Sequence, residues 1–136
     1  MFTLQNDVLR ITVKEKGAEL VSLYHVKDAI EYMWSGNPAF WGKHSPVLFP
    51  IVGALKNDTY YYNNKSYHLS RHGFARDMPF TLSTATDSEL CFTLESNAAT
   101  LQQYPFTFRF DIIYRLQQSR LTVMYRVKNT GSGDMY

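Results

Sequence analysis

Residues 106–116 read Phe-Thr-Phe-Arg-Phe-Asp-Ile-Ile-Tyr-Arg-Leu. Apolar side chains occupy every second position from Phe106 to Leu116, polar ones lie between them, and Ile113 is the exception. A period of two is typical of a β-strand with one face in the core and the other toward solvent. This stretch therefore predicts a half-buried strand.

The neighbouring segments extend the same pattern. Residues 121–127 alternate again, and residues 117–120 supply the connection, so the two strands should pair as a hairpin. Shorter alternating runs occur at 9–13 and 90–95, between turn-forming residues. We expect an all-β, antiparallel β-sandwich or barrel.

Two local signals refine this expectation. Asparagine tolerates positive φ, so Asn63-Asn64 fits a two-residue loop between strands at 59–62 and 65–69. Only residues 97–104 suggest a short helix, with Ser96 or Asn97 as its cap and Pro105 ending it.

Bulk composition excludes several functional classes. A chain of 136 residues with 45% hydrophobic residues has the size and content of one packed domain, and we find no internal linker. The net charge of +2 does not indicate nucleic-acid binding. Cys91 is a single cysteine, so no internal disulfide is expected. No basic leader and no apolar run of about 20 residues is present, so we expect a cytoplasmic protein without a membrane partner.

The run Arg71-His72-Gly73-Phe74-Ala75-Arg76 is the strongest candidate for chemistry. It brings an imidazole, two guanidinium groups and a flexible glycine together, a combination that suits a sugar. The tyrosines before it could supply flat walls for a sugar ring or simply fill strands: Tyr60, Tyr61, Tyr62 and Tyr67. Equally, His72 could satisfy a loop carbonyl, and the arginines could be solvated charges.

Other candidates carry less. His68 and His72 lie four residues apart, but Ser70 and Gly73 argue against a helix there, so we expect no metal site and no cofactor. His44 could line the pocket. Trp34 and Trp41 are expected in the core, with a stacking wall for a ligand as the alternative.

The chain as a whole resembles the aldose 1-epimerase (galactose mutarotase) family, most closely its LacX-like and hexose-6-phosphate epimerase-like branch. The resemblance is carried by Ser45-Pro46-Val47-Leu48-Phe49-Pro50-Ile51-Val52-Gly53, then Lys56-Asn57, and then His72-Gly73-Phe74-Ala75-Arg76. It implies a galactose mutarotase-like β-sandwich, a hexose or hexose phosphate as the small-molecule partner, and acid/base ring opening that exchanges α and β anomers.

The resemblance also assigns residues. His72 matches the family's first histidine, which hydrogen-bonds near the ring oxygen and is taken here as the catalytic residue. Asn57 and Arg76 match sugar-binding or phosphate-binding positions. Two family arginines are absent, because Asp58 and Ala54 stand at their positions.

Family members are longer, and their second histidine and far glutamate have no match before Tyr136. We therefore expect residues 1–136 to form a single mutarotase-like domain truncated before the C-terminal catalytic segment, and inactive alone. A non-catalytic carbohydrate-binding module is the alternative. Because an incomplete sandwich would leave sheet edges uncovered, self-association is a further expectation.

Overall fold

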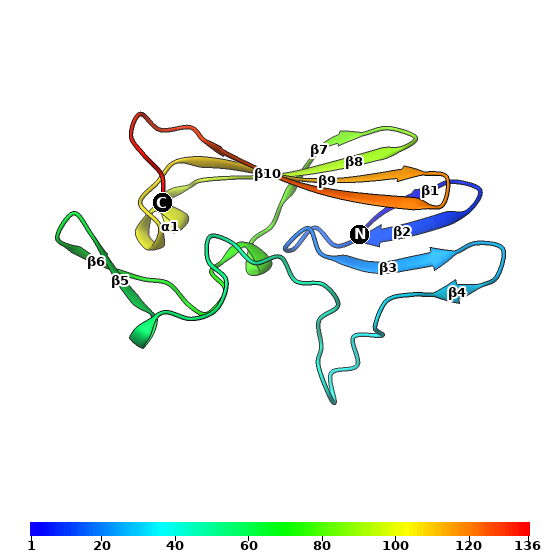
Figure 1. Ribbon diagram of the computed structural model, residues 1–136, viewed down its shortest axis with the longest axis horizontal. Helices are drawn as coiled ribbons and strands as arrows, with labels where there is room; N and C mark the ends of the chain where they lie inside the picture. The colour runs from blue at the N-terminus through cyan, green and yellow to red at the C-terminus, as the bar shows by residue number, and fades with distance from the viewer.

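A computed structural model describes all 136 residues of the chain. Two four-stranded antiparallel sheets and a separate hairpin account for its strands (Figure 1). The first sheet has the order β1 (Phe2–Gln5), β2 (Leu9–Val13), β3 (Leu20–His25) and β4 (Ile30–Glu31). The second has the order β10 (Arg120–Asn129), β9 (Phe108–Gln117), β8 (Glu89–Glu95) and β7 (Thr81–Ala85). The hairpin joins β5 (Thr59–Tyr62) to β6 (Lys65–His68).

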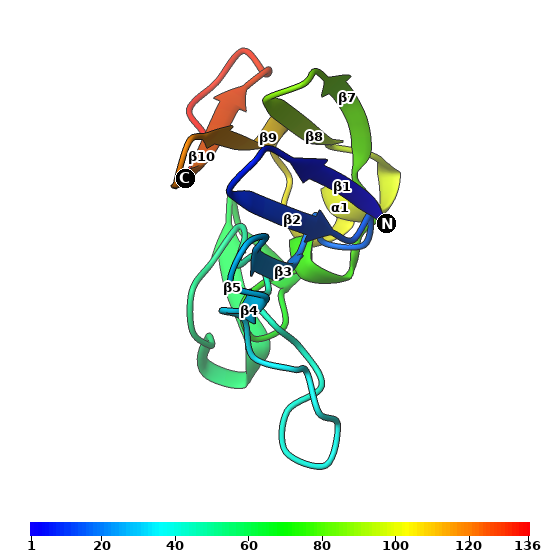
Figure 2. The same cartoon turned by 90° about the vertical axis from the view of Figure 1, so that its right-hand side faces the viewer.

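Side chains from both sheets share one hydrophobic core. The ring of Phe2 on β1 packs 5.3 Å from that of Phe92 on β8. The Tyr114 hydroxyl on β9 donates a 2.7 Å hydrogen bond to the Ala18 carbonyl just before β3. Figure 2 shows the two sheets as successive layers. The predicted all-β, antiparallel class is confirmed.

Local sequence signals are confirmed where they concern turns and caps. The predicted strand at 106–116 overlaps β9, which begins two residues later at Phe108 and pairs with β10 through the predicted hairpin. Asn63 and Asn64 both adopt positive φ, 48° and 59°, between β5 and β6. The helix α1 (Ala98–Gln103) begins after Asn97, whose side-chain oxygen accepts from the Ala99 and Thr100 amides at 2.9 and 3.1 Å.

Two expectations about burial are wrong. β9 is not half-buried at its centre, because Asp111 and Ile113, on the face opposite the core, are only 2% and 8% exposed. Cross-strand neighbours from β8 and β10 cover that face. Trp34 and Trp41 do not lie in the core; they are 44% and 50% exposed. Both belong to a non-repetitive segment that alternation cannot place.

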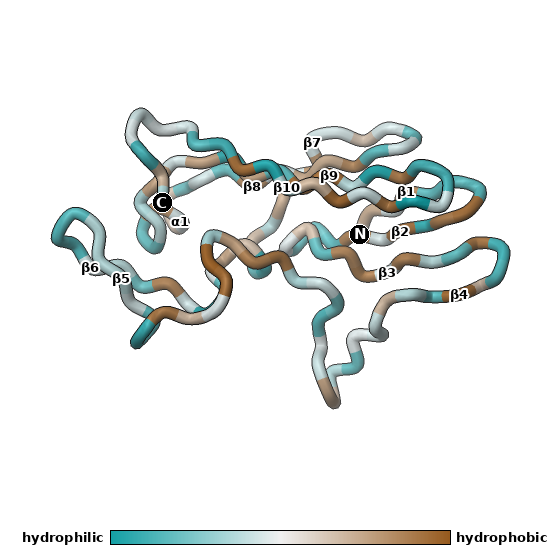
Figure 3. The backbone as a smooth tube through the Cα atoms, in the orientation of Figure 1, coloured by the Kyte–Doolittle hydropathy of each residue, from teal (hydrophilic) through white to brown (hydrophobic).

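That segment leaves β4 and returns to the body before β5. It projects away from both sheets, drawn in cyan in Figures 1 and 2. Its last part, leading into β5, is hydrophobic in Figure 3 and re-enters the core through Val47 and Phe49. No helix in the chain is long and apolar enough to cross a membrane.

Candidate functional site

The two sequence runs that suggested chemistry lie against each other. The Phe49 carbonyl accepts hydrogen bonds from the Phe74 and Ala75 amides at 3.0 and 3.2 Å. Gly73 lies opposite Phe49 with a φ of 71°, and a Cβ on Gly73 would overlap the Phe49 carbonyl. Only glycine permits this close approach without strain. These backbone contacts between Phe49 and residues 73–75 fix the positions from which the side chains of His72 and Arg76 extend.

His72 is held by a reciprocal pair of hydrogen bonds with Gly53. Its amide donates to the Gly53 carbonyl at 2.7 Å, and the Gly53 amide donates to His72 Nδ1 at 2.9 Å. His72 itself adopts a φ of 69°, an uncommon value for a side chain larger than glycine. The ring orientation is therefore set by backbone atoms, which cannot rotate away.

These bonds also select the tautomer of the ring. Because a backbone amide can only donate, Nδ1 must be unprotonated, and the neutral ring carries its proton on Nε2. Arg71 Nε lies 3.1 Å from Nε2, which would place two N–H groups face to face. Arg71 is exposed and can rotate away, so we assign the Nε2 proton from the Gly53 contact. A half-buried Nε2–H donor results.

The charge state of His72 agrees with this assignment. Partial burial of the ring, followed by the positive charges of Arg71 and Arg76, lowers the pKa of His72 from its ordinary value. The ring is thus neutral at pH 7, where it donates through Nε2 and carries no charge.

Arg76 is fixed by its neighbours. Its Nη2 donates to the Arg71 carbonyl at 2.9 Å, and its Nε lies 3.5 Å from the Asp77 carboxylate. Asp77 also lies 3.6 Å from Lys43 Nζ and 3.5 Å from Lys16 Nζ. The Asp77 carboxylate therefore lies near three positively charged side chains. Two of them, Lys43 and Arg76, line the cavity described next.

A cavity of about 580 Å³ lies between the segments 41–48 and 71–76. Its lining residues are Trp41, Lys43, Pro46, Leu48, Arg71, His72 and Arg76. Three of them are cationic and none is a carboxylate. The cavity can thus donate hydrogen bonds to hydroxyl, carbonyl or phosphate oxygens, but its lining offers no carboxylate as a base.

The predicted site residues are only partly brought together. His72 and Arg76 line the same cavity, but Asn57 does not. Asn57 lies in a 3₁₀ turn (Lys56–Asp58), is exposed and has a φ of 54°. Its role in sugar binding remains a prediction.

The tyrosines of the hairpin do not wall the His72 cavity. Tyr60, Tyr61 and Tyr62 line a separate, predominantly apolar cavity of about 480 Å³, together with residues such as Leu69 and Phe106. His44 also lies outside the His72 cavity and packs its ring against Gly36.

Lys43 is a cavity residue that sequence reasoning missed. No local pattern distinguishes it from a solvated lysine. Its position depends on the buried carboxylate of Glu19, whose Oε1 accepts from the amides of His44 and Ser45 at 2.6 and 3.1 Å. Glu19 is separated from His44 and Ser45 by 25 and 26 positions in the sequence. The only hint of this contact in the sequence is that Lys43 and His44 directly precede Ser45, where the family-like stretch begins.

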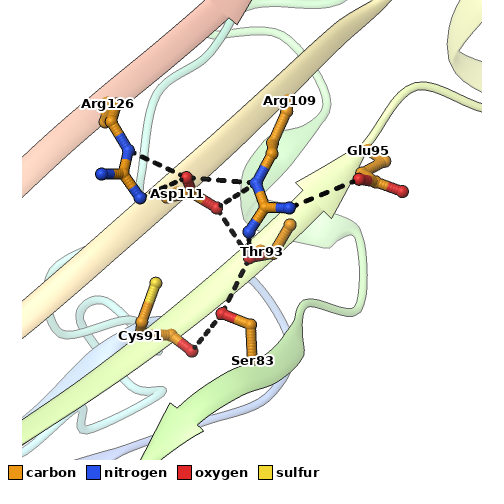
Figure 4. Close-up of polar contacts among 7 residues, drawn as sticks. All are labelled: Ser83, Cys91, Thr93, Glu95, Arg109, Asp111 and Arg126. Carbon is orange, nitrogen blue, oxygen red and sulfur yellow. Dashed lines mark hydrogen bonds and ion pairs between the residues drawn. The ribbon is translucent and has the colours of Figure 1, made fainter.

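A second polar cluster lies on the outer face of the β7–β10 sheet (Figure 4). Asp111 accepts hydrogen bonds from Thr93 at 2.6 Å and from the side chains of Arg109 and Arg126 at 2.9 Å. Thr93 on β8 and Arg126 on β10 reach it from the neighbouring strands, Arg109 reaches it along β9 itself, and the carboxylate is buried. This cluster is a structural ladder across the sheet.

Comparison with known proteins assigns the chain to a protein family. The family model for aldose 1-epimerase matches residues 1–136. The chain belongs to the aldose 1-epimerase family. The resemblance noted in the sequence is thereby confirmed.

Relatives of this family share the fold closely. A galactose mutarotase related enzyme from Lactobacillus acidophilus is 40% identical, with a TM-score of 0.96 over 98% of this chain and 45% of that one. A galactose mutarotase-like protein from Lactobacillus casei is 41% identical, with a TM-score of 0.95 over 99% of this chain and 46% of that one. Protein LacX of Lactococcus lactis is 32% identical over 93% of this chain and 44% of its own length. The chain thus spans less than half the length of these relatives.

Proposed function

We propose that this chain supplies part of the active site of an aldose 1-epimerase-type isomerase acting on an aldohexose or a hexose phosphate. The observation that carries the proposal is the His72 ring, whose Nδ1 accepts from the Gly53 amide and which lines a cavity together with Lys43, Arg71 and Arg76. Membership of the family supports the same reaction class.

The reaction requires an acid and a base. The base removes the proton from the C1 hydroxyl while the acid protonates the ring oxygen, so that the bond between C1 and the ring oxygen breaks and an open aldehyde forms. Closure on the other face of C1 gives the second anomer. In this scheme the Nε2–H of His72 donates a hydrogen bond to the ring oxygen of the sugar. This bond assists the principal acid in protonating that oxygen.

The base is not among the residues that line the cavity, since none is a carboxylate and the His72 Nδ1 lone pair is occupied by the Gly53 amide. We propose that the base, and the principal acid, come from a part of the protein outside residues 1–136. Asn57 is proposed as a further sugar contact on the family resemblance alone.

We include phosphorylated sugars among the proposed substrates because the cavity is lined by positively charged side chains. Lys43, Arg71 and Arg76 line one cavity, and guanidinium groups bind phosphate oxygens in a bidentate fashion. Asp77 lies beside two of these cations, so the cavity is not purely positive. The free hexose and its 6-phosphate are therefore both substrates to be compared.

A carbohydrate-binding module without turnover is the second candidate. The specific observation in its favour is the absence of a carboxylate from the cavity lining, which leaves a set of hydrogen-bond donors suited to holding a sugar. Such a site would bind either anomer without exchanging them.

The test combines binding with anomer exchange. Amide and imidazole NMR shifts are followed during titration with glucose and glucose 6-phosphate, and exchange NMR measures anomer interconversion. His72→Asn is the informative variant, because asparagine tolerates the positive φ at this position but cannot place a donor where Nε2 lies. His68→Asn is the control, since His68 is exposed and does not line the cavity.

In a longer protein that includes the proposed base and principal acid, acceleration of anomer exchange that falls about 100-fold in His72→Asn, but not in His68→Asn, would support the isomerase. Sugar binding that depends on His72, with no acceleration in that longer protein, would favour the binding module. If millimolar sugar moved no signal near His72 or Arg76, both candidates would be rejected.

A further inference from the structure

The walls of the His72 cavity differ in chemistry. Its apolar side chains, those of Trp41, Pro46 and Leu48, all come from the segment 41–48. Arg71, His72 and Arg76 all come from the segment 71–76 and supply N–H donors. The cavity therefore has its apolar side chains on the segment 41–48, beside the single donor Lys43, and only N–H donors on the segment 71–76.

A pyranose has matching chemistry. Its hydroxyl and ring oxygens hydrogen-bond at the edge of the ring, while its axial C–H groups form an apolar face that packs on aromatic rings. Ligand sites commonly combine aromatic walls with a few fixed polar groups in this way. Of the two aromatic rings that line this cavity, the imidazole of His72 is polar, and only the indole of Trp41 offers a large apolar ring.

The backbone of Trp41 is held by hydrogen bonds on both sides before any ligand binds. Its amide donates to the Asn37 carbonyl at 2.9 Å, and its carbonyl accepts from the Trp34 indole N–H at 2.9 Å. Its side chain is nevertheless 50% exposed. Only the side-chain torsions of Trp41 therefore remain to be ordered when a ligand packs on its ring, and a tryptophan side chain has few of them.

The segment that carries Trp41 is anchored to the body of the protein. Glu19 accepts from the amides of His44 and Ser45, and the Ser45 hydroxyl donates to the Leu20 carbonyl at 2.7 Å. On the other side, Gly17 packs against the Arg76 carbonyl, where a Cβ would come within 2.7 Å. The stretch from Gly17 to Leu20 thus contacts both segments that form the cavity.

From these observations we infer that Trp41 is the stacking wall of the cavity, against which the apolar face of the sugar ring packs. The inference rests on the proposed function and adds to it the residue that recognises the ring itself rather than its charge. Lys43, beside it, is then directed at the edge of the sugar together with Arg76.

The chain contains a matched control for this role. Phe40 precedes Trp41, belongs to the same exposed segment and is 81% exposed, but it does not line the cavity. Its ring packs instead at 6.4 Å from that of Trp34. Trp41→Ala and Phe40→Ala remove neighbouring exposed aromatic rings, and only the first changes the cavity.

The experiment is a titration of the chain with glucose and glucose 6-phosphate, followed by NMR of the Trp41 indole, the Trp34 indole and the His72 ring. We expect both sugars to shift the Trp41 and His72 signals. Trp41→Ala should weaken binding about tenfold, Trp41→Phe should lose less than about threefold because a flat ring remains, and Phe40→Ala should bind as the parent chain does.

The outcomes separate the two proposals. Shifts at His72 with an unmoved Trp41 indole, and unchanged affinity in Trp41→Ala, would overturn the stacking role and leave the sugar site intact. Equal losses in Trp41→Ala and Phe40→Ala would also overturn it, since they would point to a general effect on the segment. No shift at any of these signals would remove the sugar site itself.

Discussion

Asp111 is a buried carboxylate whose charge is fully compensated by its neighbours. Burial acts to raise its pKa, but hydrogen bonds from Thr93, Arg126 and Arg109, with the Arg109 charge, outweigh burial and hold the pKa below its ordinary value. Because the folded-state pKa is the lower one, this carboxylate stabilises the fold above the unfolded-state pKa, and the contribution is lost as pH falls through the folded-state pKa.

Asp111→Asn is therefore expected to lower the free energy of unfolding at pH 7 by about 2 kcal/mol, since an amide cannot replace a carboxylate as acceptor for two guanidinium groups. The difference between parent and variant should shrink as pH falls below about 4, where protonation weakens the parent. Urea denaturation at pH 7 and at pH 3 measures both effects.

Glu95→Gln serves as the control for this prediction. Glu95 lies 3.7 Å from Arg109, but its side chain is 67% exposed, so the change should stay within about 0.5 kcal/mol. Equal stability losses in the two variants, or a loss in Asp111→Asn that does not depend on pH, would contradict the account of Asp111.

At the scale of elements, the site depends on one crossing of two loops, at Gly73 and Phe49. Gly73→Ala would place a residue with a side chain at a left-handed φ, which is energetically unfavourable. It would also bring the new Cβ into overlap with the Phe49 carbonyl, which is backbone and cannot easily move away. We expect the free energy of unfolding to fall by about 3 kcal/mol. Thermal and urea denaturation measure the loss, and the His72 ring signal should shift because its backbone must move.

Gly53→Ala is the matched comparison. Gly53 has a φ of 90°, but a Cβ there would meet nothing within 4 Å, so only the conformational cost of about 1 kcal/mol applies. If both alanine variants lost the same stability, the overlap with Phe49 would not matter, and the crossing would be less tight than described.

Elements defined by local pattern were predictable from the sequence. The alternation of residues 106–116 located β9, the Asn63-Asn64 pair located the β5–β6 turn, and Asn97 located the start of α1. Each depends on residues within a few positions of one another. His72 and Arg76 were found because their motif is contiguous.

Features that depend on distant contacts were not predictable. Trp41 and Lys43 reach the cavity because Glu19 holds the following amides, a contact that periodicity does not report. Burial of Asp111 depends on Arg126 and Thr93, which reach it only after three strands have paired in register. Sequence alone gives the alternating pattern there but not what covers the second face.

At the scale of the whole molecule, the β7–β10 sheet ends in an unprotected edge. β10 pairs only with β9, so the backbone groups on its other side have no strand partner. It is ten residues long, and Met124, Tyr125 and Val127 are each more than 40% exposed. A long edge strand with exposed apolar side chains is a template for pairing with another chain.

We therefore expect this chain to self-associate through β10 at micromolar to millimolar concentration, which light scattering and sedimentation would show as a concentration-dependent increase in mass. Val127→Lys should shift the chain toward monomer, because a lysine on an edge strand opposes pairing and Val127 is already 44% exposed. Leu101→Lys, on α1, is the control, since it removes another exposed apolar side chain and adds the same charge at a residue that is not on the edge strand. A parent chain that stays monomeric at every concentration, or equal effects of the two lysines, would show that the β10 edge is not an association surface.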